Sequence, residues 1–136
     1  MAFGSPKPEF EPGAVYEIDA RLLCYPTTPG PQPFRKNRWI VVASNKYDCK
    51  HLPPHSLLIV ALSAALEHFD PRWDVEIPQG VGGTLRDCMA QADMVFPVAK
   101  SDLRASRRRG TIPADTMNQL RAKLRDALGL AGPFYP

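Results

Sequence analysis

The stretch that most constrains this chain is RWIVVASN at residues 38–45. Its five consecutive apolar residues, most of them aromatic or β-branched, predict a strand that is buried on both faces. Arg38 opens this strand, where a rigid backbone would hold the side chain while its guanidinium still reaches solvent. Such a group is well suited to bind a phosphate. The alternative is an ordinary core strand with a solvated arginine at one end.

Length and composition indicate one globular domain. The chain has 136 residues, of which 44% are hydrophobic and 23% are charged, and this is enough to bury a core. No apolar run is long enough to span a bilayer and the first residues lack the apolar centre of a signal peptide, so we expect a cytoplasmic protein with no membrane partner. The net charge of +3 is compatible with a polyanionic partner. Three unevenly spaced cysteines argue against a disulfide framework.

Hydrophobic patterning predicts five or six short strands before the C-terminal region. In chain order we expect a flexible proline-rich leader (1–12), a strand (14–23), a basic proline-rich loop (24–37), the strand at 38–45, a polar stretch (46–56), an apolar strand (57–62), an alternating strand (73–77), a glycine-rich turn (79–83) and one or two short strands (88–98). Pro97 argues against a single long central strand in the last of these segments.

The end of the chain predicts an amphipathic helix over residues 113–128. Met117, Leu120, Leu124 and Leu128 recur at helical spacing, with charged residues on the opposite face. We expect this apolar stripe to pack on the sheet. Strands followed by one helix predict an α+β fold with a small, strongly curved sheet or barrel.

Several polar clusters leave alternatives open. The segment CKHLPPH at residues 49–55 could contribute metal ligands, but it lacks a convincing fourth ligand and its prolines exclude a helix through both histidines, so a polar loop is the alternative. The turn at 79–83 has no phosphate-loop context and is interpreted as a hairpin turn. The arginines of 104–109 either neutralise phosphates or form a solvated helix end. His68, close to two carboxylates in sequence, is either an acid–base residue or part of a surface loop.

From residue 13 to residue 130, the order and spacing of these landmarks resemble the MazF/PemK family of toxin endoribonucleases. The segments that carry the resemblance are GAVYEID at 13–19, RWIVVASN at 38–45, ALSA at 61–64, GTLRDC at 83–88, ADMVFPVAKSDL at 92–103, and the stretch from GTI at 110–112 to LGL at 128–130. No single segment is specific, whereas their order and spacing together are.

The resemblance implies an SH3-like, strongly curved antiparallel β-barrel with a C-terminal helix, usually a homodimer, that cuts single-stranded RNA (mRNA) without a metal or other cofactor. It also implies a toxin whose cognate antitoxin inserts an acidic, disordered tail into the RNA groove. The family's catalytic arginine falls on Arg38 and its catalytic threonine on Ser63, with Asp93 as an accessory catalytic candidate. One domain would then span 13–130, between the leader at 1–12 and a tail at 131–136.

Within this resemblance, polar and basic side chains near the groove become candidates for binding the RNA backbone. They are Arg35, Lys36, Asn37, Ser44, Arg107, Arg108 and Arg109. The proline-rich basic loop at residues 25–37 would cover the RNA groove.

Some positions depart from the family pattern. Trp39 stands where the family has proline, and Met94, Phe96 and Pro97 replace its glutamine, arginine and threonine; Asp102 replaces a basic residue. These losses imply either an altered RNA sequence preference or a domain that keeps the fold without cutting. The alternatives to an endoribonuclease are therefore a member of the fold that binds RNA or a protein partner without cleavage, and a small-molecule-binding barrel unrelated to toxins.

Overall fold

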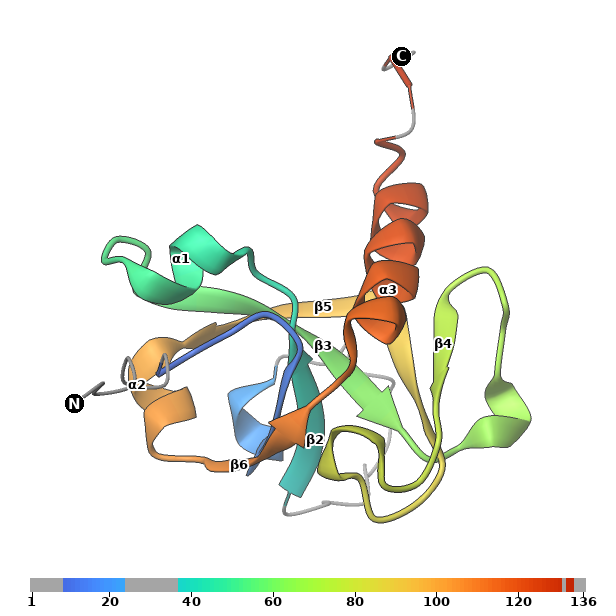
Figure 1. Ribbon diagram of the computed structural model, residues 1–136, viewed down its shortest axis with the longest axis horizontal. Coiled ribbons are helices and arrows are strands. Elements are labelled where there is room, and N and C mark those ends of the chain that lie inside the picture. Colours follow the sequence, from blue (N-terminus) through green and yellow to red (C-terminus); the bar gives the residue numbers. More distant parts are fainter. Residues whose placement is uncertain (1–8, 24–36, 131, 134–136) are drawn as a thin grey trace, which may run out of the picture.

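A computed structural model describes residues 9–23, 37–130 and 132–133. Six strands form one antiparallel sheet in the order β4-β5-β3-β2-β1-β6, and the sheet curls strongly on itself (Figure 1). The strands are β1 (Ala14–Asp19), β2 (Asn37–Val42), β3 (Ser56–Ser63), β4 (Asp74–Ile77), β5 (Cys88–Ala99) and β6 (Arg107–Thr111). The predicted α+β fold with a strongly curved antiparallel sheet is confirmed.

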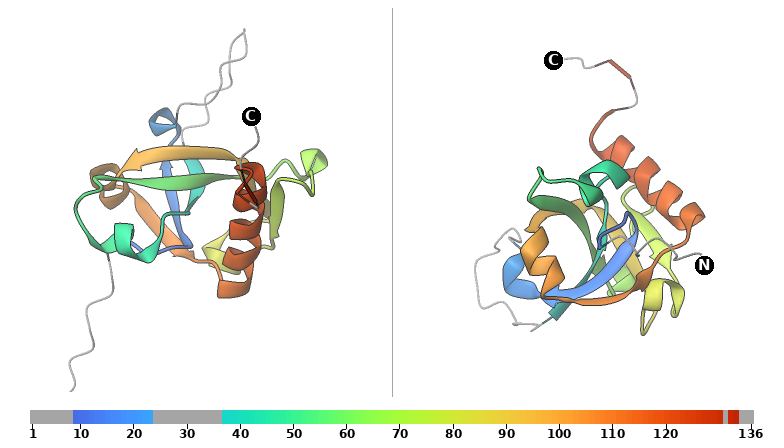
Figure 2. Two further views of the ribbon diagram at one scale, coloured as in Figure 1. Left: turned by 90° about the horizontal axis from the view of Figure 1, so that it is seen from above. Right: turned by 60° about the vertical axis from the view of Figure 1, so that its left-hand side comes forward.

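Short helices connect the strands in the described residues, and one longer helix follows them. They are η1 (Ala20–Leu22), α1 (Lys46–Lys50), η2 (Leu66–His68), η3 (Val81–Gly83), α2 (Lys100–Arg104) and α3 (Ala114–Ala127). The predicted C-terminal helix is confirmed as α3, which stands against β4 and β5 at one end of the sheet (Figure 2). Within the described ranges, no helix is both long and apolar enough to cross a lipid bilayer.

Apolar side chains cover both faces of the sheet, as the apolar run in β2 predicts. Ile40 and Val42 belong to one buried cluster, which the N-terminal segment, α1 and α2 close. Val41 belongs to a second cluster on the other face, where Met117 and Leu120 of α3 pack. A strand buried on both faces needs no polar alternation, which explains its continuous apolar sequence.

The apolar stripe of α3 is shorter than predicted. Met117 and Leu120 are buried and Leu124 is partly buried, but Leu128 is 66% exposed. The end of α3 extends past the edge of the sheet (Figure 1), so its last turn has no strand beneath it.

The curl closes where η3 meets β6, and glycines make this contact close enough. A Cβ atom added to Gly83, whose φ is +78°, would lie 2.2 Å from the carbonyl oxygen of Arg109. A Cβ atom on Gly110 would lie 2.7 Å from the backbone of Gly82. Any larger residue would push these backbones apart. The turn at 79–83 thus joins β4 to β5, as predicted, and also seals the barrel.

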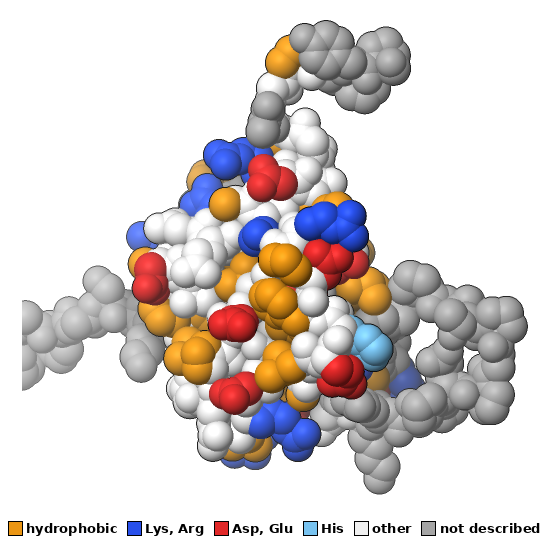
Figure 3. Space-filling model, turned by 90° about the vertical axis from the view of Figure 1, so that its right-hand side faces the viewer, with side chains coloured by type: hydrophobic (Ala, Val, Ile, Leu, Met, Phe, Trp, Pro, Cys, Tyr) orange, Lys and Arg blue, Asp and Glu red, His pale blue; other side chains and the backbone are white. Residues whose placement is uncertain are grey.

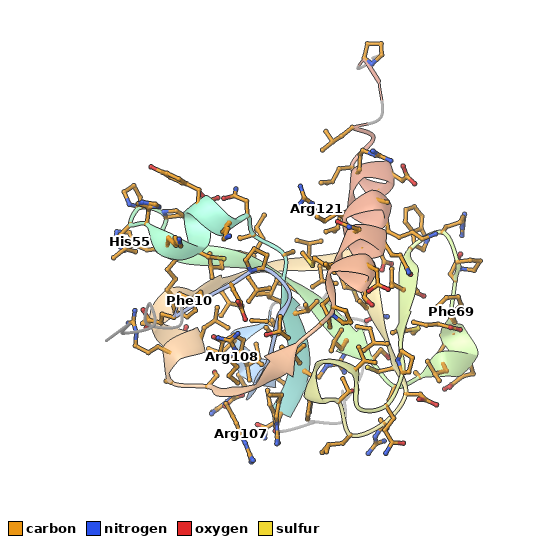
Figure 4. The ribbon with its side chains drawn as sticks, viewed as in Figure 1. Phe10, His55, Phe69, Arg107, Arg108 and Arg121 are labelled. Carbon is orange, nitrogen blue, oxygen red and sulfur yellow. The ribbon has the colours of Figure 1, made fainter. Side chains whose placement is uncertain are left out.

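Residues 9–12, which the sequence predicts to belong to a flexible leader, make contacts with the folded domain. Phe10 is only 3% exposed and belongs to the core cluster, where it lies between α1 and α2 (Figure 4). Glu9 forms an ion pair with Arg104, and Glu11 forms one with Arg108. Residues 9–12 are therefore part of the folded domain, because a single buried aromatic side chain anchors them among prolines and charges. Residues 1–8 lie outside the described residues.

Two strands differ in length from their predictions. β1 ends at Asp19, whose side chain accepts a hydrogen bond from the backbone N–H of Arg21 at 2.9 Å and begins a 3-10 turn. β5 is one strand of 12 residues rather than one or two short ones. It tolerates Pro97 because β4 pairs only with its first part, from Cys88 to Gln91, so Pro97 lies on a half of β5 that has one strand neighbour in the described sheet.

The polar stretch at residues 46–56 contains a short helix, α1, that sequence patterning missed. Asn45 caps it by accepting a hydrogen bond from the N–H of Asp48 at 2.8 Å. Lys100, which is 5% exposed, donates from Nζ to the carbonyl oxygens of Asp48 (2.6 Å) and His51 (2.7 Å). This buried amine ties the end of α1 to the start of α2, and the partners lie too far apart in the sequence to be predicted from local pattern.

Candidate active site

One pocket lies at the end of the sheet where β2 begins and β3 ends. Its volume is about 240 Å³. It is lined by Asn37, Arg38, Trp39, Leu62, Ser63, Ala64, Thr84, Leu85, Arg86 and Cys88. These residues come from the start of β2, the end of β3 and the turn that leads into β5. The pocket combines two guanidinium groups with hydroxyl and amide side chains, which is a composition suited to an oxyanion.

Antiparallel pairing explains why Arg38 and Ser63 meet in this pocket. Ile40 pairs with Ala61 across β2 and β3. Continuing this register by two residues along each strand places Arg38 opposite Ser63 on the same face of the sheet. Both side chains line the pocket. The structure thus brings together the two residues that the sequence predicts to carry the chemistry.

The surroundings of Arg38 and Ser63 favour contact with a negatively charged ligand. Arg38 is half-buried and its Nε atom is fully buried, so its charge acts in a medium less polarisable than water. The Oγ atom of Ser63 accepts a hydrogen bond from the N–H of Ala65 at 3.2 Å. That contact orients the hydroxyl and leaves its own proton available for donation to a ligand.

A chain of contacts behind the pocket holds Trp39 and Asn37 in place. The Arg109 guanidinium lies over the Trp39 ring, 4.8 Å from its centroid. Arg109 also forms an ion pair with Glu17, with its Nε 3.1 Å from Oε1, and this bonding lowers the pKa of the Glu17 carboxyl. Glu17 accepts a further hydrogen bond from Asn37 Nδ2 at 3.2 Å. Trp39, which departs from the family pattern, is therefore a built part of the pocket wall.

Sequence reasoning missed Thr84 and Arg86 as pocket residues. Thr84 is buried. Its hydroxyl donates a shared hydrogen bond to two carbonyl oxygens, that of Val81 at 2.9 Å from Oγ1 and that of Pro78 at 3.1 Å. Arg86 is exposed and adds a second guanidinium to the pocket. The only sequence signal was a basic residue within the GTLRDC segment, directly before a strand.

Cys88 lines the pocket as a neutral thiol. It is 7% exposed, and burial raises its pKa to about 11. Its Sγ lies 3.6 Å from the carbonyl oxygen of Ile77 and donates to it. Because the thiolate is the reactive and metal-binding form of cysteine, this side chain is unreactive at neutral pH.

The three arginines of β6 have different surroundings. Arg107 is exposed and points away from the sheet (Figure 4). Arg108 is ion-paired with Glu11, and Arg109 with Glu17. Two of the three charges predicted to bind RNA are thus compensated within the fold, and Arg107 is the most accessible of them.

Among the described residues, the other predicted site residues do not line the pocket. Asp93 is exposed on β5 and lies near Asp74, whose pKa is raised by burial and also by Asp93. The Oγ atom of Ser44 accepts a hydrogen bond from the N–H of Leu58 at 2.8 Å, which ties the end of β2 to β3. Arg35 and Lys36, with most of the loop at 25–37, lie outside the described residues.

The segment at residues 49–55 does not gather metal ligands. Cys49 is buried, and its Sγ lies 3.8 Å from the carbonyl oxygen of Ser44. His51 Nδ1 lies 3.0 Å from the carbonyl oxygen of Tyr47, and the two rings stack with centroids 4.1 Å apart. Among the described residues, no group of three His, Cys, Asp or Glu side chains comes together as a metal site would need.

The curled sheet and its arginine–hydroxyl pocket define a small β-barrel protein with a cationic site at one end. The family model described as "PemK-like, MazF-like toxin of type II toxin-antitoxin system" matches residues 11–128. The chain therefore belongs to this toxin family. A comparison with curated protein sequences finds no match.

Solved structures share the fold at low sequence identity. A structure described as an endoribonuclease from mycobacterial species is 22% identical, with a TM-score of 0.66 over 92% of this chain and 96% of the other. An endoribonuclease in complex with its cognate antitoxin, also from mycobacterial species, is 23% identical, with a TM-score of 0.65 over 90% and 98% of the two chains. A MazE–MazF complex from Deinococcus radiodurans is 16% identical, with a TM-score of 0.61 over 88% and 94%.

Proposed function

We propose that this protein is an endoribonuclease toxin that cuts single-stranded RNA without a metal ion. The observation that carries the proposal is the pocket in which Arg38, Arg86 and the Ser63 hydroxyl converge, in a chain that belongs to the PemK-like and MazF-like toxins. The similar structures described as endoribonucleases support it.

Cutting RNA without a metal proceeds through attack of a ribose 2′-hydroxyl on the adjacent phosphorus. The step forms a phosphorane that carries extra negative charge, and it releases the 5′-oxygen of the next nucleotide, which takes up a proton. The proton of the 2′-hydroxyl passes to a non-bridging phosphate oxygen and from there to the leaving 5′-oxygen, so that none is gained or lost overall. We assign stabilisation of the phosphorane's charge to Arg38, whose guanidinium stays protonated, and the fixing of a non-bridging phosphate oxygen to the Ser63 hydroxyl. Arg86 neutralises further phosphate charge, and Asn37 contacts the neighbouring backbone.

The donor set of the pocket supports metal-independent chemistry. The lining residues that the structure describes include no carboxylate and no imidazole, and the thiol of Cys88 is held protonated. These groups do not form the set that binds Mg²⁺ or Zn²⁺. Positive charge at the phosphate would therefore come from the two guanidinium groups.

The same pocket would be the target of the cognate antitoxin. An acidic, disordered segment placed over Arg38 and Arg86 would compete with the RNA backbone for the same charges. We also propose that the protein works as a homodimer in the cytoplasm, where mRNA is available. The toxin–antitoxin complexes among the similar structures support an antitoxin partner.

The test uses a single-stranded RNA with one cleavage site, first located by sequencing the fragments made in excess EDTA. A second RNA of the same sequence carries a 2′-deoxyribose on the 5′ side of that site. We expect the all-ribose RNA to be cut in EDTA and the deoxy-substituted RNA to stay intact at that site. Cutting that requires added Mg²⁺, or equal cutting of both RNAs, would contradict the proposal. Binding without any cutting would favour the non-cleaving alternative.

A further inference from the structure

A second pocket lies beside the first and has the opposite character. Its volume is about 330 Å³. It is lined by Leu66, Phe69, Glu76, Ile77, Pro78, Asp87 and Cys88. Cys88 lines both pockets, so the two adjoin. On the face that carries β4 and η2, hydrophobic side chains run down the middle with acidic side chains on either side (Figure 3).

The short segment from Arg86 to Cys88 lies between the two pockets and gives each a side chain of opposite charge. Arg86 lines the first pocket, whereas Asp87 lines the second. Asp87 is held in place because its Oδ1 accepts a hydrogen bond from the N–H of Gln79 at 2.8 Å. Its other oxygen, Oδ2, keeps its lone pairs for a ligand.

The lining of the second pocket excludes a phosphate and fits a neutral ring. Glu76 and Asp87 are the charged residues of its described lining, and both would repel an anion. Phe69, from the loop between η2 and β4 (Figure 4), offers an aromatic face for stacking. A nucleobase of unpaired RNA is a flat, neutral ring that proteins bind by stacking and by hydrogen bonds to its edge.

We infer that this second pocket binds the nucleobase next to the cleaved phosphate and selects a base with an exocyclic amino group. The inference rests on the proposed function, because the phosphate must occupy the first pocket for the base to reach the second. Carboxylates only accept hydrogen bonds, so Glu76 and Asp87 pair with the amino groups of adenine, cytosine or guanine. Uracil has no amino group and offers only its ring N3–H, which is one donor for two carboxylates. The segment from Arg86 to Cys88 thus contacts the RNA phosphate through Arg86 on one side and the nucleobase through Asp87 on the other.

The cleavage test compares the wild type, Asp87→Asn, Glu76→Gln and the control Glu67→Gln on an RNA of random sequence, with cut positions read by sequencing. Asp87→Asn keeps the acceptor for Gln79 and turns the second oxygen into a donor. Glu67, with a side chain 71% exposed, lies outside the pocket lining. We expect the wild type to favour amino-bearing bases over uracil at one position, and either pocket variant to reduce that ratio on the order of tenfold. Glu67→Gln keeps the wild-type ratio.

A binding test separates failure of this inference from failure of the proposed function. The affinities of the wild type and of Asp87→Asn are measured by fluorescence anisotropy for labelled oligoadenylate, oligocytidylate and oligouridylate in which every ribose is 2′-deoxy, so that the first pocket stays intact and no probe can be cut. One outcome is that the wild type cuts no RNA but binds amino-bearing bases more tightly than uracil, and that Asp87→Asn loses this preference. That result would support the base pocket and reject the nuclease. Cutting with an unchanged base preference in both pocket variants would overturn the base pocket alone. The base pocket would also be overturned if Asp87→Asn and Glu76→Gln had the mass of a monomer in solution, where the wild type has that of a dimer, and kept the wild-type base preference. The pocket would then be an interface with a second copy of the chain.

Discussion

At the scale of single residues, the account depends on which polar side chains are available to a ligand. The Ser63 hydroxyl oxygen accepts a hydrogen bond from the N–H of Ala65, so its own proton is available for donation to a ligand. Arg109, in contrast, is engaged by Glu17 and Trp39. Charge in the sequence is therefore a poor guide to charge at the site, because internal partners decide what remains.

Ser63→Ala should slow cleavage on the order of 10- to 100-fold, because it removes one donor to the phosphate in the transition state. Ser63→Thr should stay within about threefold of the wild type, since threonine keeps the hydroxyl donor. Single-turnover rates on one RNA sequence test both variants. Equal rates for Ser63→Ala and the wild type would show that the hydroxyl does not contact the reacting phosphate.

The two neighbouring arginines Arg107 and Arg108 should differ in their effect on RNA binding. Arg107→Ala should lower the slope of log affinity against log salt by about 0.7, the value for one phosphate contact with a single strand. Arg108→Ala should change the slope less, because its charge is paired with Glu11. A salt titration of RNA affinity measures both slopes. A larger change for Arg108→Ala than for Arg107→Ala would contradict this assignment.

At the scale of elements, the contact between β1, β2 and β6 connects stability to the pocket. Glu17 on β1 holds Arg109 on β6, and Arg109 supports Trp39 on β2. Both side chains of the ion pair are mostly buried, at 16% and 18% exposure. Loss of this pair should therefore weaken the fold and disturb the pocket wall together.

Glu17→Gln should lower the free energy of unfolding by about 1–2 kcal/mol at neutral pH, because it weakens a charge-assisted contact. The folded protein lowers the pKa of Glu17, so this stabilisation is present above the unfolded value near about 4.3 and is lost as pH falls below it. Urea titrations at several pH values should show the difference from the wild type shrinking below about pH 4. Glu67→Gln, on an exposed side chain, is the control. A difference that stays constant with pH would contradict the role of the Glu17 charge.

Gly110→Ala should destabilise the protein by about 1–3 kcal/mol, because the new methyl group overlaps the backbone of Gly82 where η3 seals the barrel. The same change should slow cleavage, since η3 leads directly to Thr84 and Arg86. Thermal unfolding and cleavage rate are measured on the same preparation. An unchanged unfolding midpoint would show that the contact between η3 and β6 is looser than described.

At the scale of the whole molecule, patterning predicts the parts that depend on local sequence. The apolar runs of β2 and β3 and the stripe at Met117 and Leu120 were sufficient to predict a curved sheet covered by a helix. The resemblance added Arg38 and Ser63, which the structure places in the lining of one pocket.

The remainder depends on partners far apart in the chain. Arg109 binds Glu17, which is 92 positions away in the sequence. The cluster at 104–109 alone therefore could not predict that the charge of Arg109 is compensated within the fold. Arg86 enters the pocket only because the turn after η3 reaches the end of β3. Asp93 matches the family pattern in sequence but lies on β5 outside the pocket lining.

The most direct test of the central claim is the single-turnover rate of cleavage of one single-stranded RNA in excess EDTA, by the wild type, Arg38→Ala and Asp93→Asn. The account predicts that Arg38→Ala loses on the order of 1,000-fold, because it removes the main positive charge at the phosphorane. Asp93→Asn should stay within about threefold of the wild type, since Asp93 does not line the pocket. Equal rates for Arg38→Ala and the wild type, or a larger loss for Asp93→Asn, would contradict the account.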